Sequence, residues 1–160
     1  MRVTLIRHGE AGDDAPSDEQ RALTDKGRAD TRRVGRALAR RRVRFDAVVS
    51  SPLVRAVQTA EIVVAALGKR VRVTISDSLV PEARPGGAVA MLGSLTHAKS
   101  VALVAHEPIL SRLAAALLGV ARHPPLKKSE ALRIRLADGP ERPGMLRWRI
   151  DPHTGRRKRL

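Results

Sequence analysis

The sequence predicts an α/β fold, specifically a single-domain three-layer α/β/α sandwich with a mainly parallel central sheet. Short apolar segments alternate with helical patterns over the first two thirds of the chain, which is typical of parallel strands joined by helices. Two late strand-like segments, 131–137 and 144–150, flank a Pro- and Gly-rich turn and predict an antiparallel edge hairpin near the C-terminus. The 160 residues, 42% of them hydrophobic, suit one core. We expect one domain over 1–152 and a basic tail over 153–160.

The first predicted strand, at the start of the stretch 3–11, ends abruptly in reactive side chains. An apolar, β-branched run is followed directly by Arg7, His8 and Gly9. Arginine is a permanent planar cation suited to phosphate oxygens, and histidine can act as a nucleophile or proton carrier near neutral pH. Glycine lets the backbone turn sharply and lets a ligand approach closely. This pattern predicts a buried strand that delivers a functional site to its carboxyl end.

A helix, a strand and a second helix follow. The first helix is expected over about 25–41, with Thr24 as the N-cap. A strand over 45–50 leads into the second helix, which Pro52 should open because proline fits the first helical position. Arg55 then falls in the first turn of this helix.

The next predicted elements repeat the alternation. Residues 71–75 and 100–105 are expected to be strands, with a modest helix over 88–95 between them. His106 directly follows the second of these strands, and Pro108 opens a helix with an apolar face.

The strand order along the chain predicts that four side chains meet at one edge of the sheet. Arg7, His8, Arg55 and His106 each follow the end of a predicted parallel strand, and ligands bind beyond the carboxyl ends of such strands. Two guanidinium groups can bind phosphoryl oxygens while one neutral imidazole attacks phosphorus in line. The residues therefore favour a pocket for a dianionic phosphoryl group.

Four segments in this order resemble the histidine phosphatase superfamily. They are Leu-Ile-Arg-His-Gly-Glu-Ala at 5–11, Ser17-Asp18 with Arg21 and Leu23-Thr24, Ser-Ser-Pro-Leu-Val-Arg-Ala-Val-Gln-Thr-Ala at 50–60, and Val-Ala-His-Glu-Pro at 104–108. The short chain and the loop Leu-Val-Pro-Glu at 79–82 make it most similar to the SixA-type phosphohistidine phosphatases. The resemblance covers residues 1 to about 150.

The resemblance implies a role for each matching residue. It makes His8 the nucleophile, which passes through a phosphohistidine intermediate, and it makes Arg7 and Arg55 the groups that grip the phosphoryl group. It places His106 as the completing member of the pocket and Arg21 as a further phosphate-binding arginine. It implies no metal and no organic cofactor.

The proton donor is the residue that the resemblance does not supply. Larger relatives that cleave phosphate esters use a carboxylic acid to protonate the departing alcohol, and the SixA-type enzymes lack one in the usual place. A phosphoramidate has a weak P–N bond, so it needs less assistance. Glu82 is the loop carboxylate we nominate as a possible donor, with a surface salt bridge as the alternative interpretation; Asp18 and Glu10 are weaker candidates.

The expected function is hydrolysis of a phosphoryl group carried by a protein phosphohistidine, in phosphorelay-type signalling. The alternative within enzymes is a phosphatase for small phosphate esters or nucleotide-like metabolites. Outside enzymes, the chain could be a binding module that keeps the pocket without catalysis, or a basic protein that associates with nucleic acid through its Arg-rich first helix and tail.

Composition limits the partners. The net charge of +15 suits anionic partners in general, but Phe45 and Trp148 are the only aromatic residues, so no specific nucleic acid is expected. Cysteine is absent, which excludes disulfides and thiolate metal sites. No apolar run is long enough to span a membrane, and no signal-peptide pattern is present. We expect a cytoplasmic protein without a membrane partner.

Overall fold

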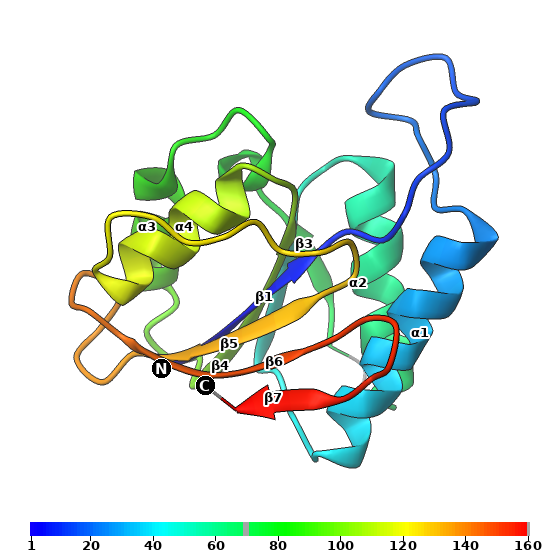
Figure 1. Ribbon diagram of the computed structural model, residues 1–160. Helices are drawn as coiled ribbons and strands as arrows, with labels where there is room; N and C mark the ends of the chain where they lie inside the picture. Colours follow the sequence, from blue (N-terminus) through cyan, green and yellow to red (C-terminus); the bar gives the residue numbers. More distant parts are fainter. Residues whose placement is uncertain (69–70, 160) are drawn as a thin grey trace.

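The computed structural model describes residues 1–68 and 71–159, which form one seven-stranded sheet in the order β3-β2-β4-β1-β5-β6-β7 (Figure 1). The strands are β1 (Arg2–Arg7), β2 (Ala47–Ser50), β3 (Val73–Ile75), β4 (Ser100–Ala105), β5 (Ala131–Arg135), β6 (Met145–Ile150) and β7 (Arg157–Arg159). The pairs β2/β3, β2/β4 and β1/β4 are parallel, whereas β5, β6 and β7 pair antiparallel. The predicted α/β sandwich with a C-terminal antiparallel hairpin is confirmed.

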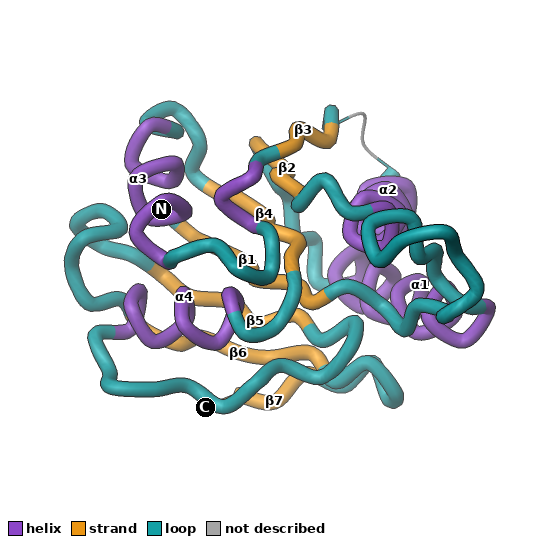
Figure 2. The backbone as a smooth tube through the Cα atoms, turned by 90° about the horizontal axis from the view of Figure 1, so that it is seen from above, coloured by secondary structure: helices purple, strands orange, loops and turns teal. Residues whose placement is uncertain are grey.

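Helices cover both faces of the sheet (Figure 2). They are α1 (Asp25–Arg40), α2 (Val54–Ala66), the short 3-10 helix η1 (Asp77–Leu79), α3 (Pro85–Ser94) and α4 (Ile109–Leu118). Neighbouring residues of β1 enter different cores: Leu5 packs with α3 and α4, and Ile6 packs with α1 and α2. Because successive side chains of a strand point to opposite faces, a strand covered on both faces is apolar throughout. Burial on both faces therefore holds β1 in place in the middle of the sheet.

Several element boundaries differ from the predicted ones. Strand β2 begins at Ala47 instead of residue 45, β5 ends at Arg135 instead of residue 137, and α4 begins at Ile109, one residue after Pro108. Helix α2 begins at Val54 and not at Pro52, because the Ser51 N–H still donates to the Val104 oxygen at 2.9 Å and keeps that backbone extended along the sheet. Helix α3 begins three residues early, at Pro85, where a missing N–H costs nothing. Strand β3 is shorter than expected and begins at Val73.

Part of the basic C-terminal tail is an edge strand. Residues 157–159 pair antiparallel with β6, although their sequence shows no alternation of apolar residues. Edge pairing uses backbone groups, so it needs no apolar pattern. Gly155, with φ 64°, forms the turn, and its N–H donates to the Asp151 oxygen at 2.8 Å. The division of the chain at residue 152 stays a prediction.

The loops after the parallel strands gather at one end of the sheet. The loop 12–22 projects beyond the carboxyl end of β1 and beside α2 (Figure 1). Its base is tied by an isolated bridge between Ala11 and Leu23. None of the described helices combines the length and the apolar character that crossing a membrane requires.

Candidate active site

The central strand β1 positions the first two site residues. It lies between β4 and β5, and backbone bonds continue beyond its end: the Arg7 N–H donates to the Glu130 oxygen at 3.1 Å, and the His8 N–H to the Ala105 oxygen at 2.9 Å. The backbone that carries both side chains is therefore held from two sides.

Gly9 is required because α1 packs directly against this position. A Cβ here would lie 2.8 Å from Thr31 Oγ1 and 2.9 Å from the Gly27 backbone oxygen. The Gly9 N–H donates to Thr59 Oγ1 at 3.1 Å, which ties the turn to α2. Glycine is therefore required at this position for two reasons: the backbone turns here, and α1 leaves no room for a side chain.

The two predicted histidines face one another. Their ring centroids lie 4.9 Å apart, and both side chains are buried, with 9% exposed surface for His8 and 2% for His106. His8 Nδ1 lies 2.6 Å from the Gly9 carbonyl oxygen, which can only accept a hydrogen bond. Nδ1 therefore carries the proton in neutral His8, and the lone pair is on Nε2.

His106 follows β4 and contacts the end of β2. Its Nε2 lies 2.8 Å from the Ser51 hydroxyl, and its Nδ1 is buried without a hydrogen-bond partner among the described residues. Ser51 was not among the predicted site residues. The resemblance already places it within the Ser-Ser-Pro segment, but nothing in the sequence shows that its hydroxyl reaches the imidazole.

Both imidazoles are held neutral. Burial chiefly lowers the pKa of His8 to about 4; the bond to Gly9 opposes this shift, and the positive charges of Arg55, Arg7 and Lys128 add to it. Burial likewise lowers the pKa of His106 to about 3, together with the charges of neighbouring groups. An imidazole that is neutral at physiological pH keeps the lone pair that nucleophilic attack needs.

Arg55 lies in the first turn of α2 and is held by the loop 12–20. Its guanidinium donates to the Asp18 backbone oxygen at 2.6 Å and to the Asp18 carboxylate at 2.9 Å. The residue is 5% exposed. Asp18 is an acceptor for this guanidinium, and the two arginines that it binds, Arg55 and Arg21, lower its pKa.

Arg7 is held by a segment far along the chain. One of its terminal nitrogens donates to the Leu126 oxygen at 2.6 Å, and its Nε is buried without a partner among the described residues. The Ser129 N–H bonds the backbone oxygens of Arg7 and His8, both at 3.1 Å. Ser129 has φ 62°, and its hydroxyl lies 3.0 Å from Thr31 Oγ1. Sequence reasoning missed this segment, and no pattern around it identifies the contact.

Arg21 joins the site through a shared carboxylate. It forms ion pairs with Asp18 at 3.0 Å and with Asp13 at 2.8 Å, and its Nε donates to the Gly12 oxygen at 2.8 Å. All of these partners belong to the loop that also holds Arg55. The structure therefore brings Arg21 beside Arg55 with its donors turned toward the loop.

In the described part of the chain, none of the nominated carboxylates forms a hydrogen bond with either histidine: His8 Nδ1 faces the Gly9 oxygen, His106 Nε2 faces Ser51, and Asp18 is bound to Arg55. Glu82 is exposed in the turn between η1 and α3 and, in the described part of the chain, forms no hydrogen bond or ion pair. Glu10 accepts a bond at 3.0 Å from the hydroxyl of Thr24, which is the N-cap of α1 as predicted. Among the described residues, no group of three metal-binding side chains is present.

These residues define a class of site. Two arginines and two neutral imidazoles converge at the carboxyl end of a mainly parallel sheet, and they bring hydrogen-bond donors and the free lone pair of an imidazole nitrogen to one place. A guanidinium pair of this kind suits a doubly charged oxyanion, and an adjacent free imidazole suits phosphoryl transfer.

Comparison with known proteins agrees with this class. Residues 3–80 match the histidine phosphatase superfamily (branch 1). Phosphohistidine phosphatase SixA from Escherichia coli (strain K12) is 30% identical over 158 residues, which cover 95% of this chain and 94% of that protein. The chain belongs to the histidine phosphatase superfamily and is a hydrolase.

Solved structures extend the similarity to the fold. The protein histidine phosphatase SixA complexed with tungstate has a TM-score of 0.89 and 30% identity, covering 96% of this chain and 99% of that one. The alpha-ribazole phosphatase from Shigella flexneri has a TM-score of 0.75 and 22% identity, covering 92% and 95% of the two chains. The second similarity shows the shared fold alone.

Proposed function

We propose that this enzyme removes the phosphoryl group from phosphohistidine in a protein, in phosphorelay-type signalling, through a phosphorylated His8. The observation that carries the proposal is the His8 imidazole, which is neutral, is protonated on Nδ1 and has its Nε2 lone pair beside two arginines. The similarity to a phosphohistidine phosphatase over nearly the whole chain supports the choice of substrate.

In the first step, His8 Nε2 attacks phosphorus and the P–N bond to the substrate imidazole breaks. The substrate imidazole leaves neutral when its other nitrogen already carries a proton, so no donor from the enzyme is needed. His8 then bears the phosphoryl group on Nε2 and a proton on Nδ1. The Gly9 oxygen, 2.6 Å from Nδ1, stabilises this positive ring.

In the second step, water attacks phosphorus and the bond to His8 Nε2 breaks. His8 leaves as the neutral imidazole with Nδ1 protonated, which is its starting state, and inorganic phosphate takes the remaining protons of the water. The ring is thus a good leaving group for the reason that it was a good nucleophile: its proton stays on Nδ1 throughout.

Arg7, Arg55 and His106 supply the donors for the phosphoryl oxygens. Arg7 Nε and His106 Nδ1 are two of only three buried side-chain polar atoms in the described part of the chain without a hydrogen-bond partner. Buried polar groups are normally paired, so these two nitrogens favour an oxyanion as their partner. Arg21 contributes through Asp18, and a direct contact to phosphate requires it to leave its loop partners.

The lack of a nearby acid favours a phosphoramidate over an ester. An alkoxide leaving group needs a proton from an acid. Asp18 forms ion pairs with Arg55 and Arg21, which keep it ionised, so it is not available as that acid. Glu82 would be the donor for esters if its turn carried it to the substrate. The alternative substrates, small phosphate esters and nucleotide-like compounds, are therefore expected to react more slowly.

Turnover of a phosphohistidine-carrying protein, a sugar phosphate and an aryl phosphate tests this assignment. We expect the highest kcat/KM on phosphohistidine, with Glu82→Gln leaving that value unchanged and lowering ester hydrolysis. Faster hydrolysis of the esters would assign the enzyme to the alternative class of substrate. Asp77→Asn, in the preceding η1 helix, is the matched control for loss of a loop carboxylate.

A further inference from the structure

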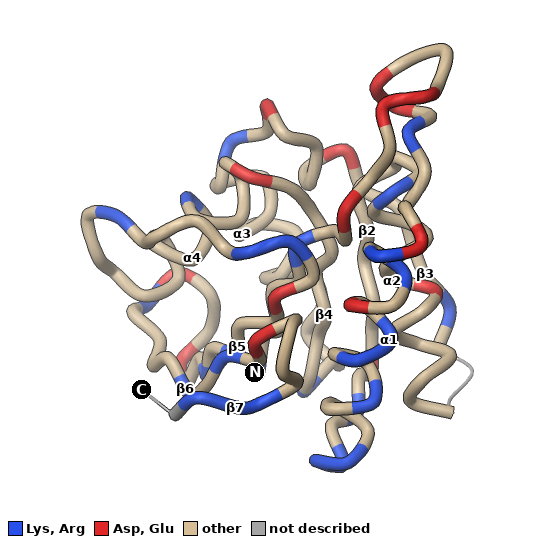
Figure 3. The backbone as a smooth tube through the Cα atoms, turned by 45° about the vertical axis from the view of Figure 1, so that its right-hand side comes forward, with Lys and Arg blue, Asp and Glu red and all other residues tan. Residues whose placement is uncertain are grey.

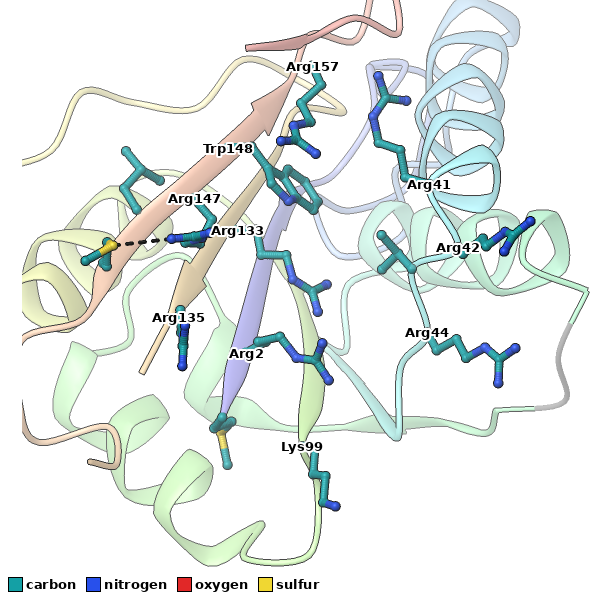
Figure 4. Close-up of a pocket in the computed structure, with 14 residues that line it drawn as sticks. Arg2, Arg41, Arg42, Arg44, Lys99, Arg133, Arg135, Arg147, Trp148 and Arg157 are labelled. Atoms are coloured by element: carbon teal, nitrogen blue, oxygen red, sulfur yellow. Dashed lines mark hydrogen bonds between the residues drawn. The ribbon is translucent and has the colours of Figure 1, made fainter. Parts of the chain in front are cut away.

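A large basic groove lies at the end of the sheet opposite to His8. It has a volume of about 1010 Å³ and is bounded by Arg2, the turn 41–44, Arg133, Arg135 and Arg147. Of its fourteen lining residues, eight are arginine and one is lysine, and none is acidic. The lining arginines come from strands β1, β5, β6 and β7 and from the turn after α1, and Figure 4 shows the guanidinium groups of Arg2 and Arg133 side by side in the middle of the view.

The groove is separate from the phosphatase site. Arg2 is the first residue of β1 and Arg7 the last, so the length of a six-residue strand, roughly 20 Å, separates the two ends. Figure 3 shows acidic residues on the protruding loop at one end of the molecule and basic residues along β7 and below α1 at the other. A ligand in the groove would therefore not occupy the phosphoryl pocket.

Most cations of the groove have no carboxylate partner among the described residues. Leaving Arg157 aside, the other seven arginines of the groove and its lysine form no ion pair with a described residue. Outside the groove, Arg21, Arg33, Arg55 and Arg149 pair with carboxylates, whereas the exposed Arg32, Arg36 and Arg112 pair with none in the described chain. The groove therefore differs from the rest of the surface in gathering cations without a carboxylate partner around one hollow. A concave surface of like charges raises the local concentration of anions and favours a bound one.

Arg133 is the clearest case, because its charge is buried. The residue is 7% exposed, and its guanidinium donates to the Thr4 hydroxyl at 3.0 Å and to the Ser100 hydroxyl at 2.9 Å. Two neutral hydroxyls leave its charge uncompensated, and Arg2 on the neighbouring strand adds a second positive charge. Burying an unpaired charge is costly, so an anion bound here would stabilise the Arg133 guanidinium by supplying the missing negative charge.

The residue types point to linked phosphoryl groups as the ligand. Arginine presents a planar fork that binds two phosphate oxygens, and it outnumbers lysine eight to one in the groove. Trp148, its only aromatic residue, is 8% exposed and lies beneath the Arg133 guanidinium, 5.7 Å from ring centre to Cζ. It offers no open face on which a base could stack, so phosphate chemistry without base recognition is favoured.

We propose that this groove binds a linear polyphosphate, a chain of phosphoryl groups joined by anhydride bonds. The volume accommodates several linked phosphoryl groups, and the cations line more than one wall of it. This proposal does not depend on which substrate the phosphatase site uses.

Trp148 fluorescence gives a signal from the groove alone, because it is the single tryptophan of the chain and it contacts Arg133. Titration with tripolyphosphate at physiological ionic strength should change that fluorescence saturably. In the variant Arg2→Gln/Arg44→Gln/Arg135→Gln, affinity should fall roughly tenfold or more, since each exposed cation contributes modestly and the three add. All three side chains are exposed, so folding and phosphatase turnover should be unchanged.

The matched control is Arg32→Gln/Arg36→Gln/Arg112→Gln, which removes three exposed arginines outside the groove and leaves the same net charge. It should bind tripolyphosphate as the parent protein does. Equal weakening in both variants would mean diffuse attraction and would overturn the proposal. Tighter binding of a single-stranded oligonucleotide or of polyglutamate, at matched charge, would also overturn it by assigning the groove to nucleic acid or to an acidic protein.

A second variant tests the buried cation. Arg133→Met should reduce the rise in melting temperature that tripolyphosphate gives the parent protein, because a ligand stabilises only the state that binds it and the groove would no longer contribute. Arg32→Gln is the control for loss of one charge. An undiminished rise in the Arg133→Met protein would contradict the role given to the groove.

Discussion

Arg55 donates to both the backbone oxygen and the carboxylate of Asp18, at 2.6 and 2.9 Å. The backbone bond positions the guanidinium, whereas the carboxylate places a negative charge beside the proposed phosphoryl pocket. The two contacts therefore have opposite consequences for phosphate: one orders a donor and the other competes for it. This separation allows charge and position to be tested independently.

Substitution of Asp18 by Asn should tighten inhibition by inorganic phosphate about two- to fivefold. The amide keeps an oxygen acceptor and the backbone bond, so Arg55 stays in place, but the competing charge is lost. Steady-state inhibition constants measure the effect. Asp14→Asn, an exposed residue of the same loop, should leave inhibition as it is. Weaker inhibition in Asp18→Asn would mean that the carboxylate mainly positions Arg55.

Stability should decline in mild acid because two buried histidines resist protonation. Their pKa values are about 4 and about 3 in the folded protein, against 6.5 for an ordinary histidine. The unfolded chain therefore takes up protons first, and stability that is complete above pH 6.5 is lost as pH falls through the folded-state values. For His8 alone the loss approaches roughly 3 kcal/mol at pH 4.

Urea unfolding at neutral pH and near pH 4 measures this decline. His106→Asn should make the dependence shallower, whereas His97→Asn, at an exposed position, should not. An unfolding free energy that is independent of pH over this window would show that neither imidazole is held neutral by burial.

Replacement of Gly9 by Ala should damage both folding and activity. The new methyl group would meet Gly27 backbone and Thr31, which cannot move without shifting α1, so we expect about 1–3 kcal/mol of destabilisation. Phosphatase activity should fall as His8 shifts with the turn. Gly86→Ala in α3 is the control, because no atom lies within 4 Å of its added Cβ. Denaturant unfolding and turnover on one substrate compare the two variants.

Loss of the Ser51 hydroxyl should reduce kcat about tenfold with little change in KM, since a misaligned donor chiefly affects the transition state. The hydroxyl lies 2.8 Å from His106 Nε2 and is buried, so Ser51→Ala leaves that nitrogen without its partner. Ser111→Ala, which removes a hydroxyl bonded to the Pro108 oxygen, is the control. An unaltered kcat in Ser51→Ala would show that packing alone orients His106.

The parts predicted from the sequence are those with local causes. An apolar run that ends in Arg7 and His8 is a strand with a site at its end because burial on both faces of the sheet demands it. The positions of Arg55 and His106 follow from the same rule applied to β2 and β4. The wrong boundary at Pro52 arose because a residue suited to a helix start can also sit in the turn before one.

The contacts that hold these residues could not be predicted. Ser129 and Leu126 bind Arg7 from a segment of irregular backbone, and Asp18 reaches Arg55 from an irregular loop. Their positions depend on how loops close over the sheet, and loop closure leaves no periodic pattern in the residues. The same is true of β7, whose pairing with β6 follows no apolar pattern in the residues.

The most direct test of the central claim is rapid-quench labelling with a substrate that carries radioactive phosphate. We predict a transient phosphorylated enzyme that is labile in acid and stable in alkali, with the label on the peptide that contains His8, and neither label nor turnover in His8→Ala. Release of phosphate by His8→Ala at the rate of the unaltered enzyme would contradict the account.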